Sequence, residues 1–541
     1  MDNEKEKNGR GGIKIALVIA AIIVLIIILA LLLSKCGGAP EEPGSPSPSE
    51  NGGEPRTDTG DQTPEGVHVH AFGAWTVLTQ PTCTSPGEHQ RTCTSCGYAE
   101  KEDLSPLGHD GHNNVCVTCG KKAVEPEKLS YSSYPYGDGL WITRADGFTD
   151  TDVLIPDVIG GEPVVCIAAS AFEGNETIAS LSLPDSVTQL GSFIFYNCPS
   201  LRMIRFGKNI GNQHTVIAGY CPNLKYLTVA PENKELHSDR SCVIETETKT
   251  LLMGCGGSSI PDDGSVLVID TYAFQCCSAL ASIAVPSPVM TIKQNAFTSC
   301  FGLISVDISD SVTTIEQYAF SSCRALKEVK LPAHLKEIGV ETFYDCTALE
   351  EITIPGEVTI LGSDCFYGCT SLKTVRLPEG LKEILNAAFK KCTSLESITL
   401  PSGLTSLGSA FSGCTSLREI VIPGGIEQMY SGTFFECSSL RKVQLPGKLE
   451  EIPVSFFGSC TALTEVTVPD SVTSIERAAF NNCTALASIT LPASLKYVGE
   501  DIFEGCSSLR TVSFRGSQAQ WESLRWDESD DCLKKARVVY N

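Results

Sequence analysis

Potential metal ligands gather in one short stretch of the sequence, residues 67–122. Two C-x-x-C pairs, Cys93 with Cys96 and Cys116 with Cys119, are separated by 19 residues, which is a spacing typical of a zinc ribbon. A glycine follows each pair and lets the chain turn so that both sulfurs can point at one ion. The sequence therefore predicts a zinc-ribbon-like module whose four ligands are Cys93, Cys96, Cys116 and Cys119.

The other ligand types in this stretch leave its chemistry open. A second tetrahedral set is predicted from His70, Cys83, His109 and His112. The alternative is oxidation to disulfides, which form outside the cell but would leave one of the five cysteines of the stretch unpaired. A module with few large apolar side chains needs either a bound metal or disulfides to be stable. Because the sequence has no H-E-x-x-H motif to supply a general base, the zinc is predicted to be structural.

A much longer element must carry this module, namely a column of cysteines that recur every 23 residues. From Cys277 to Cys506 only the step before Cys414 is shorter, at 22 residues, and a phenylalanine precedes each cysteine by three positions. A fixed period of this length, with leucines at short offsets, is typical of a leucine-rich solenoid, in which each coil packs on its neighbours. Because neighbouring Cβ bonds in a stack point the same way, the thiols are predicted to be reduced and buried, without disulfides.

The repeat phrase, SL-x-x-I-x-LP-x-x-L-x-x-I-x-x-x-AF-x-x-C, resembles the BspA-type leucine-rich repeats of bacterial and protist surface proteins. The resemblance covers roughly residues 150 to 541. It implies an extracellular, non-enzymatic surface for binding or adhesion, without naming a ligand. The phrase from His70 to His112 is similar to a short module found beside repeats in bacterial surface proteins. The tail with Trp521 and Trp526 resembles the closing segment of this repeat family.

The predicted fold class is an α/β-type solenoid dominated by β structure, with 23-residue coils and a parallel sheet, plus one N-terminal transmembrane helix. The L-x-x-I-x-L segment of each coil points alternate side chains inward and forms a short strand that a proline ends. We expect an N-terminal cap and first coil over 127–175 and a solenoid over 176–506. A hairpin insertion near 230–265 is predicted to protrude from one side, and a helix with a last strand should cap the end over 507–541.

An unbroken apolar run of 19 residues that begins at Ile15 is long enough to cross a bilayer. Because lysines and an arginine precede it, residues 1–14 are predicted to be cytoplasmic, 15–35 to form the membrane helix and the rest to face outward. A cleaved signal peptide and a lipid attached to Cys36 are the alternatives. Residues 36–66, rich in Pro, Gly, Ser and acidic side chains, are predicted to be a disordered stalk.

The net charge and the residue types of the chain limit the classes of function that it could have. A formal charge of −23 argues against nucleic acid or an anionic lipid surface as the main partner. No cluster of acid, base and nucleophile, and no phosphate loop, indicates an enzyme. The predicted function is therefore binding of proteins or surfaces at the plasma membrane, with a structural spacer as the alternative. The exposed central positions of successive strands form the predicted binding row, Lys330, Thr353, Arg376, Thr399, Gln444 and Thr467.

Overall fold

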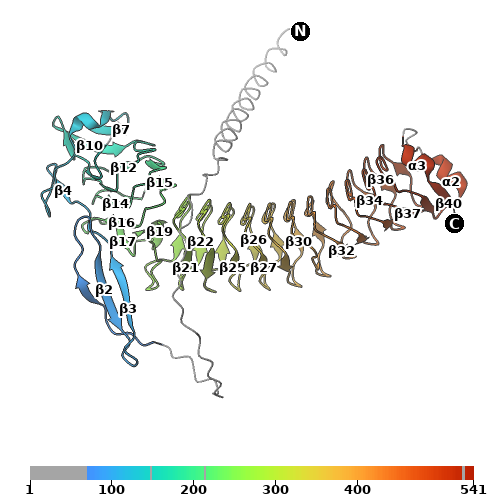
Figure 1. Ribbon diagram of the computed structural model, residues 1–541, viewed down its shortest axis with the longest axis horizontal. Coiled ribbons are helices and arrows are strands. Elements are labelled where there is room, and N and C mark those ends of the chain that lie inside the picture. The colour runs from blue at the N-terminus through green and yellow to red at the C-terminus, as the bar shows by residue number, and fades with distance from the viewer. Residues whose placement is uncertain (1–69, 146–148, 213–214, 525, 527–529, 541) are drawn as a thin grey trace, which may run out of the picture. The chain divides into compact units, whose positions relative to one another are not determined.

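The computed structural model describes residues 70–145, 149–212, 215–524, 526 and 530–540 (Figure 1). The predicted cytoplasmic segment 1–14, the membrane helix over 15–35 and the stalk over 36–66 lie outside the described residues. Within the part of the chain that is described, no helix combines the length and the apolar character needed to cross a bilayer.

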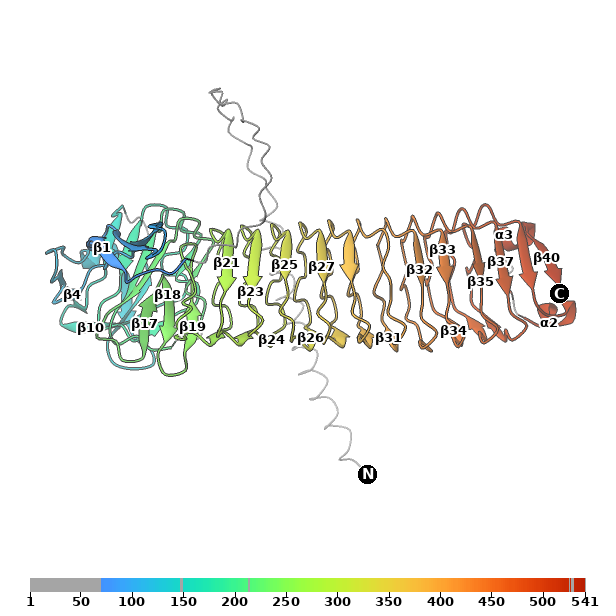
Figure 2. The same ribbon diagram turned by 90° about the horizontal axis from the view of Figure 1, so that it is seen from below.

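Most coils contribute one strand to the main parallel sheet, as the L-x-x-I-x-L pattern predicts (Figure 2). Val306 pairs with Val329 one coil later, and both side chains are buried, whereas Asp307 beside them is exposed. We call the row of outward side chains the strand face. Its strands are β8 (Asp152–Leu154), β11 (Ser180–Ser182), β14 (Met203–Phe206), β16 (Tyr226–Val229), β21 (Ser282–Val285), β23 (Ser305–Ile308), β25 (Glu328–Lys330), β27 (Glu351–Thr353), β29 (Thr374–Arg376), β32 (Glu419–Val421), β33 (Lys442–Gln444), β35 (Glu465–Thr467), β37 (Ser488–Leu491) and β39 (Thr511–Phe514).

A second, shorter strand and tight turns return the chain after each proline. Left-handed residues make the corners, for example Glu341 at φ 50° and Asp345 at φ 56° in one coil. In most coils these return segments contain two-residue strands. They are β12 (Gln189–Leu190), β20 (Val268–Ile269), β22 (Thr291–Ile292), β24 (Thr314–Ile315), β26 (Glu337–Ile338), β28 (Ile360–Leu361), β30 (Glu383–Ile384), β31 (Ser406–Leu407), β34 (Glu451–Ile452), β36 (Ser474–Ile475) and β38 (Tyr497–Val498).

Phenylalanine and cysteine columns fill the interior. From Phe274 to Phe434 the rings stack with centroids 4.9 to 5.8 Å apart. The column thiols are free, and all are buried except the half-buried Cys277. The sequence did not reveal their partner: Sγ of Cys369 donates to the carbonyl oxygen of Phe343, one coil earlier, at 3.2 Å. Twelve thiols make this bond, at 3.0 to 3.4 Å.

The predicted hairpin insertion is part of a three-stranded antiparallel unit, β17 (Leu236–Asp239), β18 (Cys242–Glu245) and β19 (Thr250–Met253). The prediction that it protrudes is wrong. Strand β19 continues into the stack by pairing in parallel with β20, and Ile244 and Leu251 are fully buried. Burying the alternate apolar side chains on one side of the hairpin is more favourable than leaving them in water. The hairpin therefore completes the core at the coil in which Ala218 occupies the position of the column phenylalanine.

Irregular elements flank the first and last coils at the two ends of the solenoid. At the N-terminal end, the 3-10 helix η1 (Pro126–Lys128) leads into the hairpin of β6 (Ser130–Ser133) and β7 (Leu140–Arg144), and β7 pairs with β10 (Glu162–Ile167). At the other end lie two short helices where one was expected, α2 (Gln518–Ser523) and α3 (Asp531–Lys535), followed by β40 (Arg537–Tyr540) in parallel with β39. The short strands β9 (Val158–Ile159), β13 (Phe195–Tyr196) and β15 (Ala218–Gly219) complete the first coils.

The Cys/His-rich stretch, described from residue 70 onward, is an antiparallel meander beside the first coils (Figure 1). Strands β1 (Thr76–Thr79), β2 (Gly87–Thr92) and β3 (Ala99–Leu104) form its sheet. A small hairpin of β4 (Gly111–His112) and β5 (Val115–Cys116) follows. We call residues 70–122 the module.

Candidate metal centre and strand face

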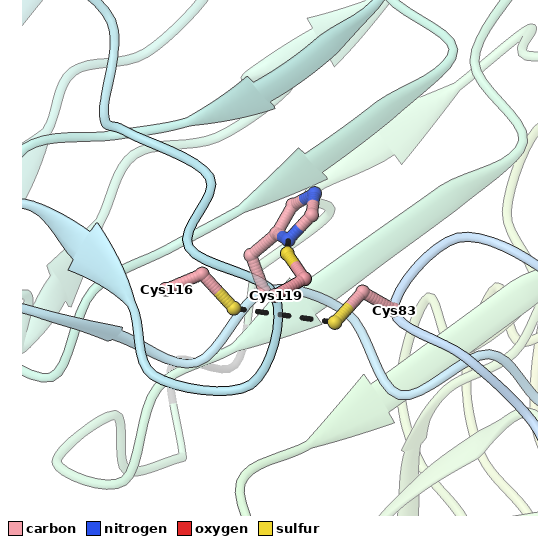
Figure 3. A group of neighbouring side chains, drawn as sticks. Cys83, Cys116 and Cys119 are labelled. Atoms are coloured by element: carbon pink, nitrogen blue, oxygen red, sulfur yellow. Dashed lines mark hydrogen bonds between the residues drawn. The ribbon is translucent and has the colours of Figure 1, made fainter.

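Four potential ligands meet beneath the module, Cys83, His109, Cys116 and Cys119, with their ligand atoms all within 4.8 Å of one another (Figure 3). Sγ of Cys83 lies 4.0 Å from Sγ of Cys116, and Sγ of Cys119 lies 3.3 Å from Nδ1 of His109. The turn that joins Cys116 to Cys119 closes when the Gly120 N–H donates to the Cys116 carbonyl at 2.9 Å, with Gly120 at φ 75°. We call these four residues the His109 cluster.

A second group, His70 with Cys93 and Cys96, lies at the surface of the module. Sγ of Cys96 is 3.2 Å from Nδ1 of His70, whose ring stacks on Tyr98 at a centroid distance of 4.8 Å. A hydrogen bond with the Ser95 hydroxyl lowers the pKa of Cys93 to about 4, so its sulfur is a thiolate at neutral pH. We call these three residues the His70 cluster.

The predicted four-cysteine ribbon does not assemble. Cys93 and Cys96 belong to the turn between β2 and β3, whereas Cys83 precedes β2 and His109 follows β3 at the opposite end of the same strand pair. Six paired residues at about 3.4 Å each set the two ends roughly 17 Å apart, far beyond the span of one ion. The two C-x-x-C pairs therefore find different partners.

The predicted second set is divided in the same way. Cys83 and His109 join one C-x-x-C pair, and His70 joins the other. His112 is exposed in β4 and belongs to neither group. The structure thus brings cysteines and histidines together in two groups, and the grouping depends on how the hairpin folds.

Burial and hydrogen bonds shift the pKa values of the His109 cluster in both directions. The Asp152 carboxylate accepts a hydrogen bond from Nε2 of His109 at 2.7 Å and raises the pKa of His109 to about 9. Burial raises the pKa of Cys83 to about 12. Burial acts in the same direction on Cys116, but hydrogen bonds from the Cys119 backbone N–H and from His109 outweigh it and lower the pKa of Cys116 to about 6. Three sulfurs and one imidazole at these separations are a set that suits zinc.

The loop over residues 108–110 lies on the strand face of the first coils. The His109 backbone N–H donates to Oγ of Ser182 at 2.9 Å. The Asp110 carboxylate pairs with the Arg205 guanidinium at 3.2 Å. The module therefore carries its metal ligands and its contacts with the solenoid on the same loop.

This covering of the face was missed by the sequence reasoning, as was Asp152. Asp103 adds a further contact by accepting from Nζ of Lys225 at 3.0 Å. Arg205 is only 3% exposed, whereas Asp307, at the equivalent outward position of strand β23, is exposed. One signal was available in the sequence: Met203 and Tyr226 put large side chains at an outward strand position, where the strands from β21 onward carry Ser, Thr, Glu or Lys.

From β21 onward the strand face is open. It contains hollows of about 870 Å³ over β21–β27 and about 570 Å³ beside β32 and β33. Charges pair within the face, with Lys373 at 3.1 Å from Glu350 and Arg418 at 3.3 Å from Glu396. All six residues of the predicted binding row are exposed there, namely Lys330, Thr353, Arg376, Thr399, Gln444 and Thr467.

The sequence of the solenoid was compared with those of known protein families. The signature of the BspA type leucine rich repeat region matches residues 154–246, 249–369, 336–464 and 450–524. The chain belongs to the BspA-type leucine-rich repeat family. The family and the solenoid predicted from the sequence are thus confirmed, and the module lies outside the matched residues. A search among curated proteins found no match.

Several solved structures are similar to this BspA-type chain. A leucine-rich repeat protein from Bacteroides ovatus is 24% identical, with a TM-score of 0.47, over 77% of this chain and 99% of the other. A leucine rich cell surface protein from Faecalibacterium prausnitzii is 23% identical, with a TM-score of 0.40, over 74% and 97%. The pneumococcal vaccine antigen PcpA is 16% identical, with a TM-score of 0.38, over 77% and 98%. The family assignment rests on the repeat signature.

Proposed function

We propose that this BspA-type protein binds other proteins or surfaces outside the cell and does no catalysis. In this proposal, the predicted helix over 15–35 anchors the chain in the plasma membrane with its N-terminus in the cytoplasm. The predicted stalk over 36–66 holds the repeats away from the bilayer. The repeat family is a scaffold fold, which is consistent with protein binding or adhesion.

The observation that carries the proposal is the open strand face beyond β21. There, a regular parallel sheet holds exposed side chains around a hollow of about 870 Å³, whereas the same face of the first coils is covered by the module. The module also provides an example of how the face accepts a protein segment. A backbone N–H meets Ser182 and a carboxylate meets Arg205.

One observation favours the alternative, a structural spacer without a ligand. The charges of the open face pair with each other, as Lys373 does with Glu350, and the six residues of the binding row include no aromatic side chain. Tight interfaces usually depend on aromatic and arginine anchors. A self-neutralised face would suit a spacer that must avoid partners.

Filling the hollows distinguishes these two functions. Thr353→Trp and Thr399→Trp place bulky side chains in the two hollows, and Glu379→Trp is the matched control at an exposed turn outside both. The full-length chain in mild detergent is tested for saturable binding to a panel of purified secreted and cell-surface proteins. We expect binding that the double variant weakens at least tenfold and the control retains. No saturable binding by the parent chain would favour the spacer.

Membrane orientation is tested separately on intact cells that express the full-length chain. A protease that cannot enter the cell should remove the repeats and leave the predicted segment 1–14 protected. Protection of the repeats would contradict the outward orientation, whatever the binding experiment shows.

A further inference from the structure

The geometry of the His109 cluster fits one metal ion better than a disulfide. Zinc–sulfur bonds of about 2.3 Å place two sulfurs of a tetrahedron roughly 3.8 Å apart, whereas a disulfide needs about 2.05 Å. Sγ of Cys83 and Sγ of Cys116 lie 4.0 Å apart. Nδ1 of His109 and Sγ of Cys119 complete the group within the same 4.8 Å. The soft sulfur donors and the tetrahedral spacing select zinc among common divalent ions.

The carboxylate of Asp152, in the solenoid, accepts a hydrogen bond from the ring nitrogen of His109 that faces away from the cluster. His109 directs Nδ1 toward the cluster and bonds through Nε2 to Asp152 of β8 at 2.7 Å. Histidine ligands of metals usually donate their other ring N–H in this way, which fixes the tautomer and orients the ring. Asp152 is itself held by the Ser180 hydroxyl and by Lys121, whose Nζ lies 3.7 Å away. The orientation of a ligand in the module is therefore set by the first strands of the solenoid.

The loop that carries His109 is shaped by the strand face as well as by the cluster. Gly108 has a φ of 72°, and a Cβ at this position would collide with the Arg205 side chain. Gly108 N–H also donates to the carbonyl of Cys83 at 3.0 Å, so the loop joins a ligand on one side to the buried guanidinium on the other. On the solenoid side, Leu154 packs against Cys83 and Cys116.

We propose that Cys83, His109, Cys116 and Cys119 bind one zinc ion, and that this ion fastens the module onto the strand face of the first coils. The ion replaces the predicted four-cysteine ribbon as the staple of the module. Asp152 acts as a positioning residue for His109. When the metal is lost, loop 108–110 leaves the face and exposes Ser182 and Arg205. This inference does not depend on the proposed binding function of the open face.

The test uses the full-length chain in mild detergent, purified without chelators. Zinc is measured by mass spectrometry before and after Cys83→Ser/Cys116→Ser, and amide hydrogen exchange is followed with and without a zinc chelator. We expect the double variant to lose one zinc per chain. Chelation should speed exchange at least tenfold in peptides that span 104–117, because the amides of Gly108 and His109 lose their partners, the Cys83 carbonyl and the Ser182 hydroxyl. Peptides over 200–207 should keep their protection, because the amides of β14 pair with neighbouring coils. Peptides over β25 should not change.

Two further variants separate the metal from the fold. Cys93→Ser/Cys96→Ser, the matched control in the His70 cluster, should leave protection of 104–117 and 200–207 intact. Asp152→Asn should retain zinc but bind it 10- to 100-fold more weakly in competition with a chromophoric chelator, as expected for the loss of a carboxylate behind a histidine ligand. Unchanged exchange over β25 and β27 shows in each case that the solenoid is still folded.

Three results would overturn the proposal. The first is a zinc content that Cys83→Ser/Cys116→Ser leaves unchanged. The second is a disulfide between Cys83 and Cys116 in peptide maps of the native chain. The third is zinc that can be removed without any change in exchange at 104–117, which would show that the ion does not hold the module on the strand face.

Discussion

The cysteines of the solenoid and those of the module differ in their surroundings and in their protonation. In the solenoid, a thiol such as Cys369 is fully buried, donates to a carbonyl one coil earlier, and has its pKa raised well above the usual value by burial. In the module, Cys93 and Cys116 lie beside histidines, and hydrogen bonds lower their pKa values to about 4 and about 6. Sulfurs such as that of Cys369 are neutral packing groups, whereas those of Cys93 and Cys116 lie beside histidines as candidate ligands.

This comparison shows that the pattern of cysteines, more than their number, indicates their chemistry. A strict period of 23 places each sulfur against the next coil, where no charged partner can reach it. Short C-x-x-C pairs in turns bring two sulfurs to one point, where a histidine can join them. The predictions that follow probe the difference between the two regions.

The largest expected effect is the loss of solenoid stability in alkali. Unfolded thiols ionise near their ordinary pKa of 9.0, whereas burial raises the folded pKa of column thiols such as Cys300, Cys346 and Cys369, which keep their protons. The stabilisation is therefore complete below about pH 9 and is lost as pH rises toward the folded pKa, by about 1.4 kcal/mol per pH unit for each such thiol. Summed over these thiols, this exceeds the effect of any single substitution. Urea midpoints that stay equal at pH 8 and pH 10 would contradict buried neutral thiols.

Removing one ring from the phenylalanine column should come next. Phe366 stacks on Phe343 and Phe389 with centroid distances of 5.5 Å on both sides and is fully buried. Phe366→Ala should cost about 3–5 kcal/mol in urea unfolding, because it removes the buried ring and leaves a cavity. Tyr367→Ala in the same coil is the control: its side chain is half-buried, so it should cost clearly less. Equal costs would mean that the column is not the core.

Two arginines at equivalent outward positions test the covered and open parts of the strand face. Arg205→Ala should cost about 1–3 kcal/mol, because it removes a buried side chain that packs against Gly108 and pairs with Asp110 under the module. Arg376→Ala on the open face should change stability by less than about 0.5 kcal/mol, since its pair with Glu351, at 3.6 Å, is exposed. Similar values for both would show that the module does not cover the face in solution.

The smallest effect is expected for single sulfurs. Cys369→Ala should cost about 1–2 kcal/mol, because it removes a fully buried sulfur and the bond that this thiol donates to the Phe343 carbonyl, which keeps only the Cys346 N–H as donor. Cys96→Ala, at an exposed position, should leave the stability of the metal-free protein within about 0.5 kcal/mol. Thermal unfolding of the chelated protein measures both. A cost for Cys96 as large as that for Cys369 would erase the distinction between the two regions.

Much of the solenoid could be predicted because its information repeats. The spacing of Phe366, Cys369 and their counterparts fixes the coil length, and the alternation in L-x-x-I-x-L fixes which side chains face inward. The caps followed from departures from the period. What could not be predicted was the thiol–carbonyl bond, since it depends on the path of the backbone in the turn before each cysteine.

The sequence indicates cysteines and histidines as candidate ligands, but it does not show how the fold groups them. Spacing along the chain suggested that Cys93 and Cys116 would share an ion, yet the β2–β3 hairpin holds them at opposite ends. Asp152 was not predictable either, because it comes from a strand 43 residues beyond His109 and meets it only when the module docks. Contacts between a module and a repeat array leave no period in the sequence to reveal them.

Thiol labelling of the native full-length chain tests the central claim most directly. The chain is treated with an alkylating reagent at neutral pH, with and without a zinc chelator, and the labelled cysteines are identified by mass spectrometry. We predict that Cys83, Cys116 and Cys119 become labelled only after chelation, while the buried column thiols stay unlabelled in both samples. Labelling of the column in the folded chain, or module sulfurs found in disulfides in both samples, would contradict the account.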